Sequence, residues 1–264
     1  FHQDVIIRPT DQVADHCIQL VEHCRHTGRR PALVFAMNPE KSMQSEHDPD
    51  IRQLLQQADL LIPDGVGTCI GARVLNGVRI RRVPGSELMP ELCTRAEREG
   101  LSVYIYGASP ESNALAVENM RAIWPRLRIV GASHGFMPPG ELKDLARLHN
   151  PETAGTVAAR IAAARPDIVF VGLGSPRQER WMAEIGVHLP VGLLQGVGGT
   201  IDVLSGTATR SRTASHASRA RRAGAPMGTV RSLSPLPSTR TVEFSKSTSR
   251  NPSPHASEMR SPLA

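Results

Sequence analysis

The stretch PDIVFVGLGSPRQE, residues 166–179, holds the pattern that decides the fold. Its short apolar run ends in glycines, and a serine and a proline then begin a segment of helical composition. Continuous apolar runs of this length, bounded by glycine, are typical of strands buried on both faces of a parallel sheet. The stretch therefore predicts one β–α unit of an α/β protein.

The same pattern extends outward over residues 31–206. Strands are predicted within six runs: PALVFAMN (31–38), ADLLIPDG (58–65), LSVYIYGAS (101–109), LRIVGAS (127–133), PDIVFVGLGS (166–175) and VGLLQGVGG (191–199). The segments between them have helical patterns. GASPESN and GLGSPRQE each predict a helix with Ser at the N-cap and Pro at the first helical position. We expect a Rossmann-like layered α/β fold with a mostly parallel sheet and ligands at the carboxyl ends of the strands.

A helix is also predicted before the first strand. In DQVADHCIQLVEHC, residues 11–24, the apolar side chains recur at helical spacing, which places one set on a single buried face: Val13, Cys17, Leu20, Val21 and Cys24. The four cysteines form no C-x-x-C pair, so reduced thiols of a cytoplasmic protein are expected rather than a disulfide framework. No apolar run approaches the roughly 20 residues of a membrane span, and no signal-peptide pattern is present.

The charge is concentrated at one end of the chain. Of the formal net charge of +6, residues 207–264 carry +8, from nine Arg and one Lys against two Glu, so residues 1–206 carry −2. The 207–264 segment is rich in Ser, Thr, Arg and Pro and has no sustained apolar period, so a disordered basic tail is predicted. Without interleaved aromatic residues, specific nucleic-acid binding is not expected. The folded domain is predicted to span residues 1–206.

Asp64, in LLIPDGVG, follows the second predicted strand. An Asp between Pro and Gly is often only a turn residue. The same sheet edge should also present Asn38, at the end of the first strand, and a carboxylate there could accept a proton from an incoming hydroxyl. Both interpretations stand at the level of the sequence.

Three further segments are candidates for binding a phosphate group. In GVRIRRVPGSEL, the three closely spaced arginines Arg79, Arg81 and Arg82 are usually a solvated basic edge, but near the strand ends one of them could bind a diphosphate. Gly85 with Ser86 indicates a helix start, whose free N–H groups favour anions. The glycine turns GLGSPRQE and GVGGT would let the backbone approach a ligand, or are simply tight turns; their candidate residues are Gly172, Gly174, Ser175, Gly198 and Gly199. Gln178 either faces the site or completes a capping box with Ser175.

Two other patterns are interpreted structurally. HDPD contains an Asp-x-Asp triplet, but Asp48, Pro49 and Asp50 fit the first positions of a helix better than a metal site. GVGTCIG, residues 65–71, spells a loose dinucleotide fingerprint that begins with Gly65, yet it follows the second strand rather than the first. No metal and no cofactor are predicted.

Several long motifs occur together in this order: NPEKSMQ, ADLLIPDGVG, RRVPGSEL, VGLGSPRQERW and GVGGTIDVLSG. Over roughly residues 5–206 the chain closely resembles the WecG/TagA/CpsF glycosyltransferases, glycosyltransferase family 26. The resemblance implies an inverting, metal-independent transfer of an N-acetylmannosamine-type sugar or another hexose from a UDP-sugar to a polyprenyl-diphosphate-linked acceptor. The setting would be bacterial cell-surface polysaccharide synthesis.

The resemblance also implies roles for individual residues. Asp64 would be the catalytic base, Arg82 would bind the diphosphate, and Asn38 and Gln178 would bind substrate. It further implies a cytoplasmic enzyme held peripherally at the inner face of the plasma membrane, with self-association as a family expectation.

The chain departs from the family pattern in two places. Ala36 stands where many relatives carry threonine. From Thr207 onward, the Ser/Arg/Pro-rich residues replace the family's amphipathic membrane-binding segment, and their composition is what an altered reading frame would produce. One alternative is therefore a nucleotide-sugar-binding protein that no longer turns over. A second, supported by residues 65–71 alone, is an NAD(P)-dependent oxidoreductase.

Overall fold

The computed structural model describes residues 9–77, 79–136 and 156–208. Of the predicted tail, only Thr207 and Ala208 fall within these ranges, so the disorder expected for it concerns residues outside the described part of the chain. The domain boundary at residue 206 likewise stays a prediction.

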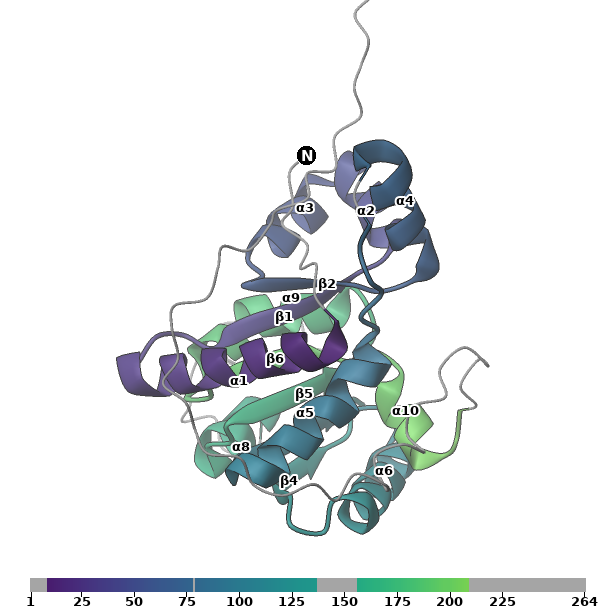
Figure 1. The fold of residues 1–264 in the computed structure, drawn as a ribbon. Coiled ribbons are helices and arrows are strands. Elements are labelled where there is room, and N and C mark those ends of the chain that lie inside the picture. The colour runs from purple at the N-terminus through teal and green to yellow at the C-terminus, as the bar shows by residue number, and fades with distance from the viewer. Residues whose placement is uncertain (1–8, 78, 137–155, 209–264) are drawn as a thin grey trace, which may run out of the picture.

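Six strands form one sheet in the order β2-β1-β6-β5-β3-β4 (Figure 1). Every pairing between them is parallel. The strands lie within the six predicted apolar runs: β1 (Ala32–Met37), β2 (Leu60–Pro63), β3 (Ser102–Gly107), β4 (Arg128–Ser133), β5 (Ile168–Gly172) and β6 (Leu193–Gly196). The predicted α/β class and the predicted strand positions are confirmed.

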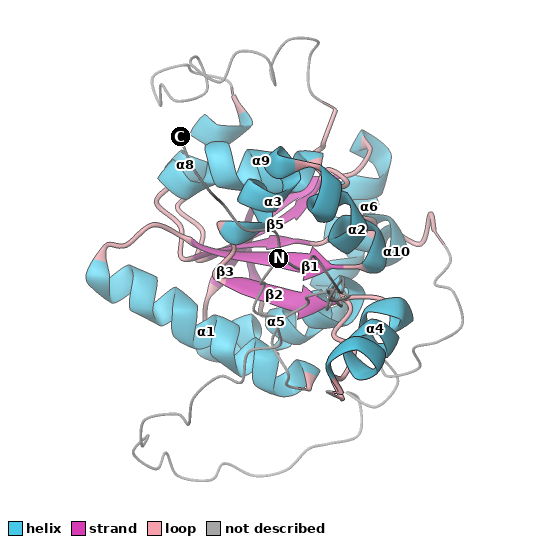
Figure 2. Cartoon of the chain, turned by 90° about the horizontal axis from the view of Figure 1, so that it is seen from above, coloured by secondary structure: helices cyan, strands magenta, loops and turns pink. Residues whose placement is uncertain are grey.

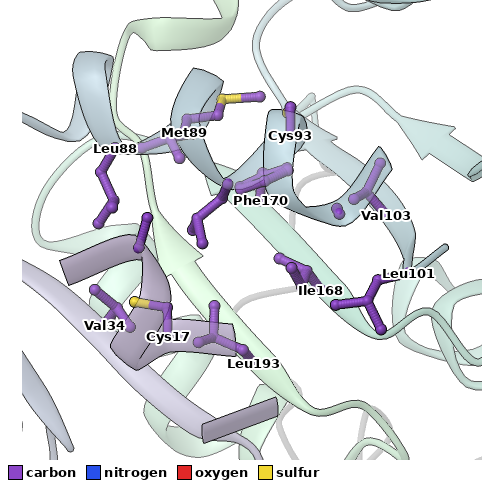
Figure 3. Close-up of a cluster of buried hydrophobic side chains, with 14 of the residues drawn as sticks. Cys17, Val34, Leu88, Met89, Cys93, Leu101, Val103, Ile168, Phe170 and Leu193 are labelled. Atoms are coloured by element: carbon purple, nitrogen blue, oxygen red, sulfur yellow. The ribbon is translucent and has the colours of Figure 1, made fainter. Parts of the chain in front are cut away.

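One face of the sheet is covered by α1 (Thr10–Thr27), α5 (Gly85–Glu99), α6 (Pro110–Ile123) and α10 (Thr200–Ser205), whose apolar side chains share one buried cluster. Figure 3 shows Cys17 of α1 and Cys93 of α5 among the side chains of this cluster, together with Phe170 and Leu193 of the strands. The predicted apolar face of α1 is confirmed, with Leu20 only partly buried against the cluster.

The other face carries α3 (Pro49–Gln56), α8 (Val157–Ala164), α9 (Arg177–Glu184) and the short 3-10 helix η1 (Gly186–His188). Trp181 of α9 is buried edge-on against Tyr106 of β3, with ring centroids 4.8 Å apart. Figure 2, a view from above, shows helices on both sides of the strands. The fold therefore has three layers, as expected for buried parallel strands.

Two helices, α2 (Pro39–His47) and α4 (Val66–Asn76), follow the ends of β1 and β2 directly. Figure 1 shows them close together at one end of the molecule. The helices α2 and α4 come into close contact at Gly67. A Cβ at this position would lie 2.6 Å from Cγ of Pro39, closer than two carbon atoms can pack. This glycine of the dinucleotide-like fingerprint is thus required by helix packing.

The two predicted Ser-Pro helix starts have different outcomes. Ser109 is the N-cap of α6, and its hydroxyl accepts the Ser112 N–H at 3.0 Å, as expected. For α9 the prediction is wrong: the helix begins at Arg177, and Ser175 caps nothing. The N–H of Gln178, which a Ser175 cap would bind, instead donates to the carbonyl of Gly174 at 2.9 Å.

Candidate functional site

Asp64 and Asn38 leave the sheet from neighbouring strands. Met37 and Pro63 are register partners at the ends of β1 and β2. The backbone N–H of Asp64 donates to the carbonyl of Met37 at 2.8 Å, which joins the two chain segments beyond the last strand residues. The structure therefore brings these two predicted site residues to the same sheet edge, and both are half-buried.

Asn38 has a structural task as well. It is the N-cap of α2, and its Oδ1 accepts the backbone N–H of Lys41 at 2.8 Å. Gly65 is the N-cap of α4 with φ of 92°, a left-handed conformation that favours glycine. The chain thus turns sharply directly after Asp64, and turn chemistry accounts for part of this corner.

Arg82 lies in the segment that returns from α4 to α5. The following residue, Val83, donates its N–H to the carbonyl of Pro63 at 2.8 Å, so Arg82 is held next to the end of β2. Its guanidinium is 3.6 Å from a carboxylate oxygen of Glu87, in the first turn of α5. As predicted, α5 begins at Gly85, and no side chain caps its first turn.

The thiol of Cys69 on α4 reports on both charges. Burial raises the pKa of this thiol; the Arg82 guanidinium opposes that change, and the Asp64 carboxylate adds to it. Both side chains therefore act on one point of α4 by charge. The predicted base and the predicted diphosphate ligand lie in the same electrostatic neighbourhood.

The glycine turns after β5 and β6 meet at the adjacent part of the sheet edge. A Cβ on Gly172 would lie 2.9 Å from the carbonyl oxygen of Gly198, and a Cβ on Gly85 would lie 3.6 Å from that of Gly196. The start of α5 therefore lies beside the end of β6. Gly174, Ser175 and Gly199 follow in these turns, and Ser86 is the second residue of α5, so all the predicted glycine and serine positions lie at the carboxyl edge.

Gln178 connects two of these turns. Its Oε1 accepts the N–H of Gly198 at 3.0 Å, and its Nε2 donates to Oε1 of Glu179 at 3.0 Å. The capping box with Ser175 is therefore absent, and a contact between Gln178 and substrate stays a prediction. Gln178 is buried, because Gly196 leaves room for its amide.

A buried ion pair beneath this edge was not assigned from the sequence. Nζ of Lys41 lies 2.5 Å from Oε1 of Glu179 and also donates to the carbonyl of Ala36 at 2.8 Å. Both side chains are almost completely buried, at 8% and 1% exposure. The signal was present in the motifs NPEKSMQ and SPRQE, where each charge follows a candidate site residue by a few positions.

The Asp-x-Asp triplet is a helix start. Oδ1 of Asp48 accepts the N–H groups of Asp50 and Ile51, at 2.9 and 3.3 Å, at the beginning of α3. The capping interpretation is confirmed. Within the described ranges no cluster of three or more His, Cys, Asp or Glu side chains has the arrangement of a metal site.

A cavity of about 710 Å³ opens at the opposite, amino edge of the sheet, and none of the predicted site residues lines it. The carboxylate in its lining, Asp167, is already engaged: it accepts from the backbone and hydroxyl of Ser102 and pairs with Arg25. The carboxyl edge is the stronger candidate, because it combines an available carboxylate, an arginine and a helix start. Among the helices described, none has the length and apolar character needed to cross a bilayer.

The sequence was compared with known proteins. Residues 5–217 match the family model described as "Glycosyl transferase WecG/TagA/CpsF family". Two relatives, from Bacillus spizizenii and Bacillus subtilis strain 168, are each named N-acetylglucosaminyldiphosphoundecaprenol N-acetyl-beta-D-mannosaminyltransferase. Both are 29% identical to this chain. The first match, over 208 residues, covers 78% of this chain and 76% of the relative; the second, over 180 residues, covers 68% and 65%.

The family match covers most of the chain and includes every strand of the sheet together with the corner at Asp64. The chain therefore belongs to the WecG/TagA/CpsF family of glycosyltransferases.

Proposed function

We propose that this protein transfers an N-acetylmannosamine-type sugar from a UDP-sugar to a polyprenyl-diphosphate-linked acceptor, with inversion at the anomeric carbon. Family membership and the names of the two relatives support the acceptor class and the sugar. The observation that carries the assignment of the site is the backbone bonding at the end of β2, where the Asp64 N–H donates to the Met37 carbonyl and the Val83 N–H donates to the Pro63 carbonyl. These bonds hold the segments that carry Asp64 and Arg82 at the carboxyl end of the same strand.

Asp64 is the proposed general base. As the acceptor hydroxyl attacks the anomeric carbon, a new C–O bond forms and the hydroxyl proton passes to the Asp64 carboxylate. The bond from the anomeric carbon to the diphosphate breaks at the same time, and its electron pair leaves with UDP. The half-buried position of Asp64 suits this role, since the carboxylate can still meet a substrate.

The departing diphosphate gains negative charge and requires positive charge nearby. Arg82 and the N-terminus of α5 provide it, the first through its guanidinium and the second through backbone N–H groups that no side chain caps. Gln178 holds the N–H of Gly198 in place at the neighbouring turn. Asn38, directly after β1, lies at the same sheet edge.

This arrangement predicts transfer without a divalent ion. Turnover measured in excess EDTA should equal turnover with added Mg²⁺, because Arg82 and α5 already stabilise the leaving group. Loss of activity in EDTA that Mg²⁺ restores would contradict the metal-independent mechanism.

The central test is Asp64→Asn, assayed with UDP-N-acetylmannosamine and a lipid-diphosphate-linked acceptor. The amide keeps the shape of the corner but cannot accept the proton, so kcat should fall by about 10²- to 10⁴-fold with KM for the donor little changed. Asp48→Asn is the matched control: it changes the helix cap of α3, away from the site, and should keep turnover. Substantial turnover in Asp64→Asn would remove this residue from the role of base.

Binding of UDP in titration calorimetry, together with no sugar transfer in the turnover assay, would identify the nucleotide-sugar-binding alternative. A nicotinamide cofactor has less support, since the role of Gly67 in its fingerprint is explained by the contact with Pro39.

We also propose that the protein acts peripherally at the inner face of the plasma membrane, where a lipid-linked acceptor would reside. Self-association remains a prediction from the family resemblance.

A further inference from the structure

The helix α4 presents large apolar side chains to solvent. Val66, Ile70 and Val74 are 57%, 57% and 74% exposed. They are spaced four residues apart, so they line one side of the helix. We call this set the α4 apolar face.

The side of α4 that packs on the protein includes the small residues Ala72 and Thr68. Ala72 is fully buried, and Thr68 is 5% exposed, with its hydroxyl donating to the carbonyls of Met37 and Asp64 at 3.2 and 3.0 Å. A surface helix usually turns its large apolar residues inward, whereas Val66, Ile70 and Val74 are exposed. Met43, 67% exposed on the neighbouring α2, adds to the apolar surface at this end of the molecule.

Arginines accompany the α4 apolar face. Arg73 lies on the helix itself and is exposed, as are Arg79 and Arg81 in the segment that follows. This segment must run back along α4, because α4 ends at Gly77 while Val83 is bonded to Pro63, next to the start of the helix. Figure 1 shows this return path from the far end of α4 to the body of the protein.

Exposed apolar side chains on a helix, flanked by arginine, are the arrangement by which a helix lies in a membrane interface. The apolar groups enter the boundary of the acyl chains, and the guanidinium groups contact anionic headgroups. A soluble partner would be expected to bring acidic side chains and a matching groove; a bilayer supplies both the apolar layer and the negative charge.

We propose that the α4 apolar face binds the surface of a bilayer that contains anionic lipids. Asp64 lies two residues before Val66, so this contact would bring the predicted base to the level at which a lipid-linked diphosphate lies. That last step rests on the proposed function, whereas the membrane contact itself does not. The proposed contact does not require the basic segment after residue 208, and the test separates the two.

The test measures flotation of the full chain with vesicles of phosphatidylglycerol and phosphatidylethanolamine, at about 0.1 M and about 0.5 M salt. High salt weakens purely electrostatic attraction, including that of the basic residues 209–264, and leaves apolar insertion. The double variant Ile70→Gln with Val74→Gln should partition about tenfold less than the parent at high salt. Ile123→Gln is the control: it removes a comparable side chain, 51% exposed on α6, and should bind as the parent does.

Hydrogen exchange localises the contact. Vesicles should slow exchange of the amides in residues 66–77 of the parent, but not in the double variant. Equal partitioning of the double variant and the parent would overturn the proposal. So would a parent oligomer that the double variant converts to monomer, which would make the face an interface between copies. If residues 209–264 protected these amides in the absence of vesicles, that result would also overturn the proposal.

No substrate enters these measurements. A negative vesicle result therefore overturns the membrane contact alone, while failure of the proposed transfer would appear only in the turnover of Asp64→Asn and its parent.

Discussion

At the scale of single residues, the pair Lys41–Glu179 is the main structural feature beneath the site. It joins the first turn of α2, after β1, to the first turn of α9, after β5. Glu179 also accepts from Gln178, which in turn holds Gly198. Its second oxygen, Oε2, has no hydrogen-bond partner among the described residues. One buried carboxylate thus connects three of the segments that form the carboxyl edge.

Glu179→Gln should lower the free energy of unfolding by about 3 kcal/mol, because it leaves the buried Lys41 charge uncompensated. Urea denaturation measures the change. Glu99→Gln, which breaks the exposed pair with Arg98, is the control and should cost less than about 1 kcal/mol. A double variant, Lys41→Met with Glu179→Leu, should recover part of the loss. If Glu179→Gln and Glu99→Gln destabilised the protein equally, the role of burial would be contradicted.

At the scale of elements, the strand ends approach one another through glycine. Gly107, the last residue of β3, has φ of 135°, and a Cβ there would lie 2.2 Å from the carbonyl oxygen of Gly172 on β5. Neither the conformation nor the space admits a larger residue. The apolar run predicted β3, but the contact that requires this glycine comes from a strand more than sixty residues away in the sequence.

Gly107→Ala should therefore destabilise the protein by about 2 kcal/mol or more, through the left-handed backbone and the contact with backbone atoms of β5. Thermal unfolding followed by circular dichroism measures it. Gly199→Ala is the matched change: with φ of −78° and no atom closer than 4.0 Å, it should alter stability by less than about 0.5 kcal/mol. A Gly107→Ala protein as stable as the parent would show that the strand ends can separate freely.

At the scale of the whole molecule, the layer between α1, α5 and the sheet encloses two thiols (Figure 3). Burial raises the pKa of Cys17 to about 12, with a smaller opposing effect from Arg95, and burial also raises the pKa of Cys93. In the unfolded chain both thiols ionise near pH 9. Folding therefore opposes their ionisation.

The sign of the pH dependence follows. The stability that these thiols support is fully present below about pH 9 and is lost as the pH rises toward 12, by up to about 1.4 kcal/mol per pH unit for each thiol. Urea denaturation between pH 8 and 10.5 should show this fall. The variant Cys17→Ala with Cys93→Ala starts less stable, because of the cavities, but should lose stability less steeply. Identical slopes would exclude the thiols as the cause.

The amino-acid sequence by itself determined the layered α/β class, the six strands and the sheet edge at which the candidate residues gather. Apolar runs of strand length separated by helical patterns suffice for this, since they are local features and parallel strands must expose their carboxyl ends together. The same holds for the caps at Asp48 and Ser109, whose partners lie within a few residues.

Only the tertiary structure decided the strand order, the partner of Gln178 and the pairing of Lys41 with Glu179. It also decided that Ser175 is not a cap and that Val66, Ile70 and Val74 of α4 face outward. Each of these depends on groups far apart in the chain. Periodicity and motifs record what a residue prefers locally, whereas burial and charge compensation depend on which distant segment is packed against it.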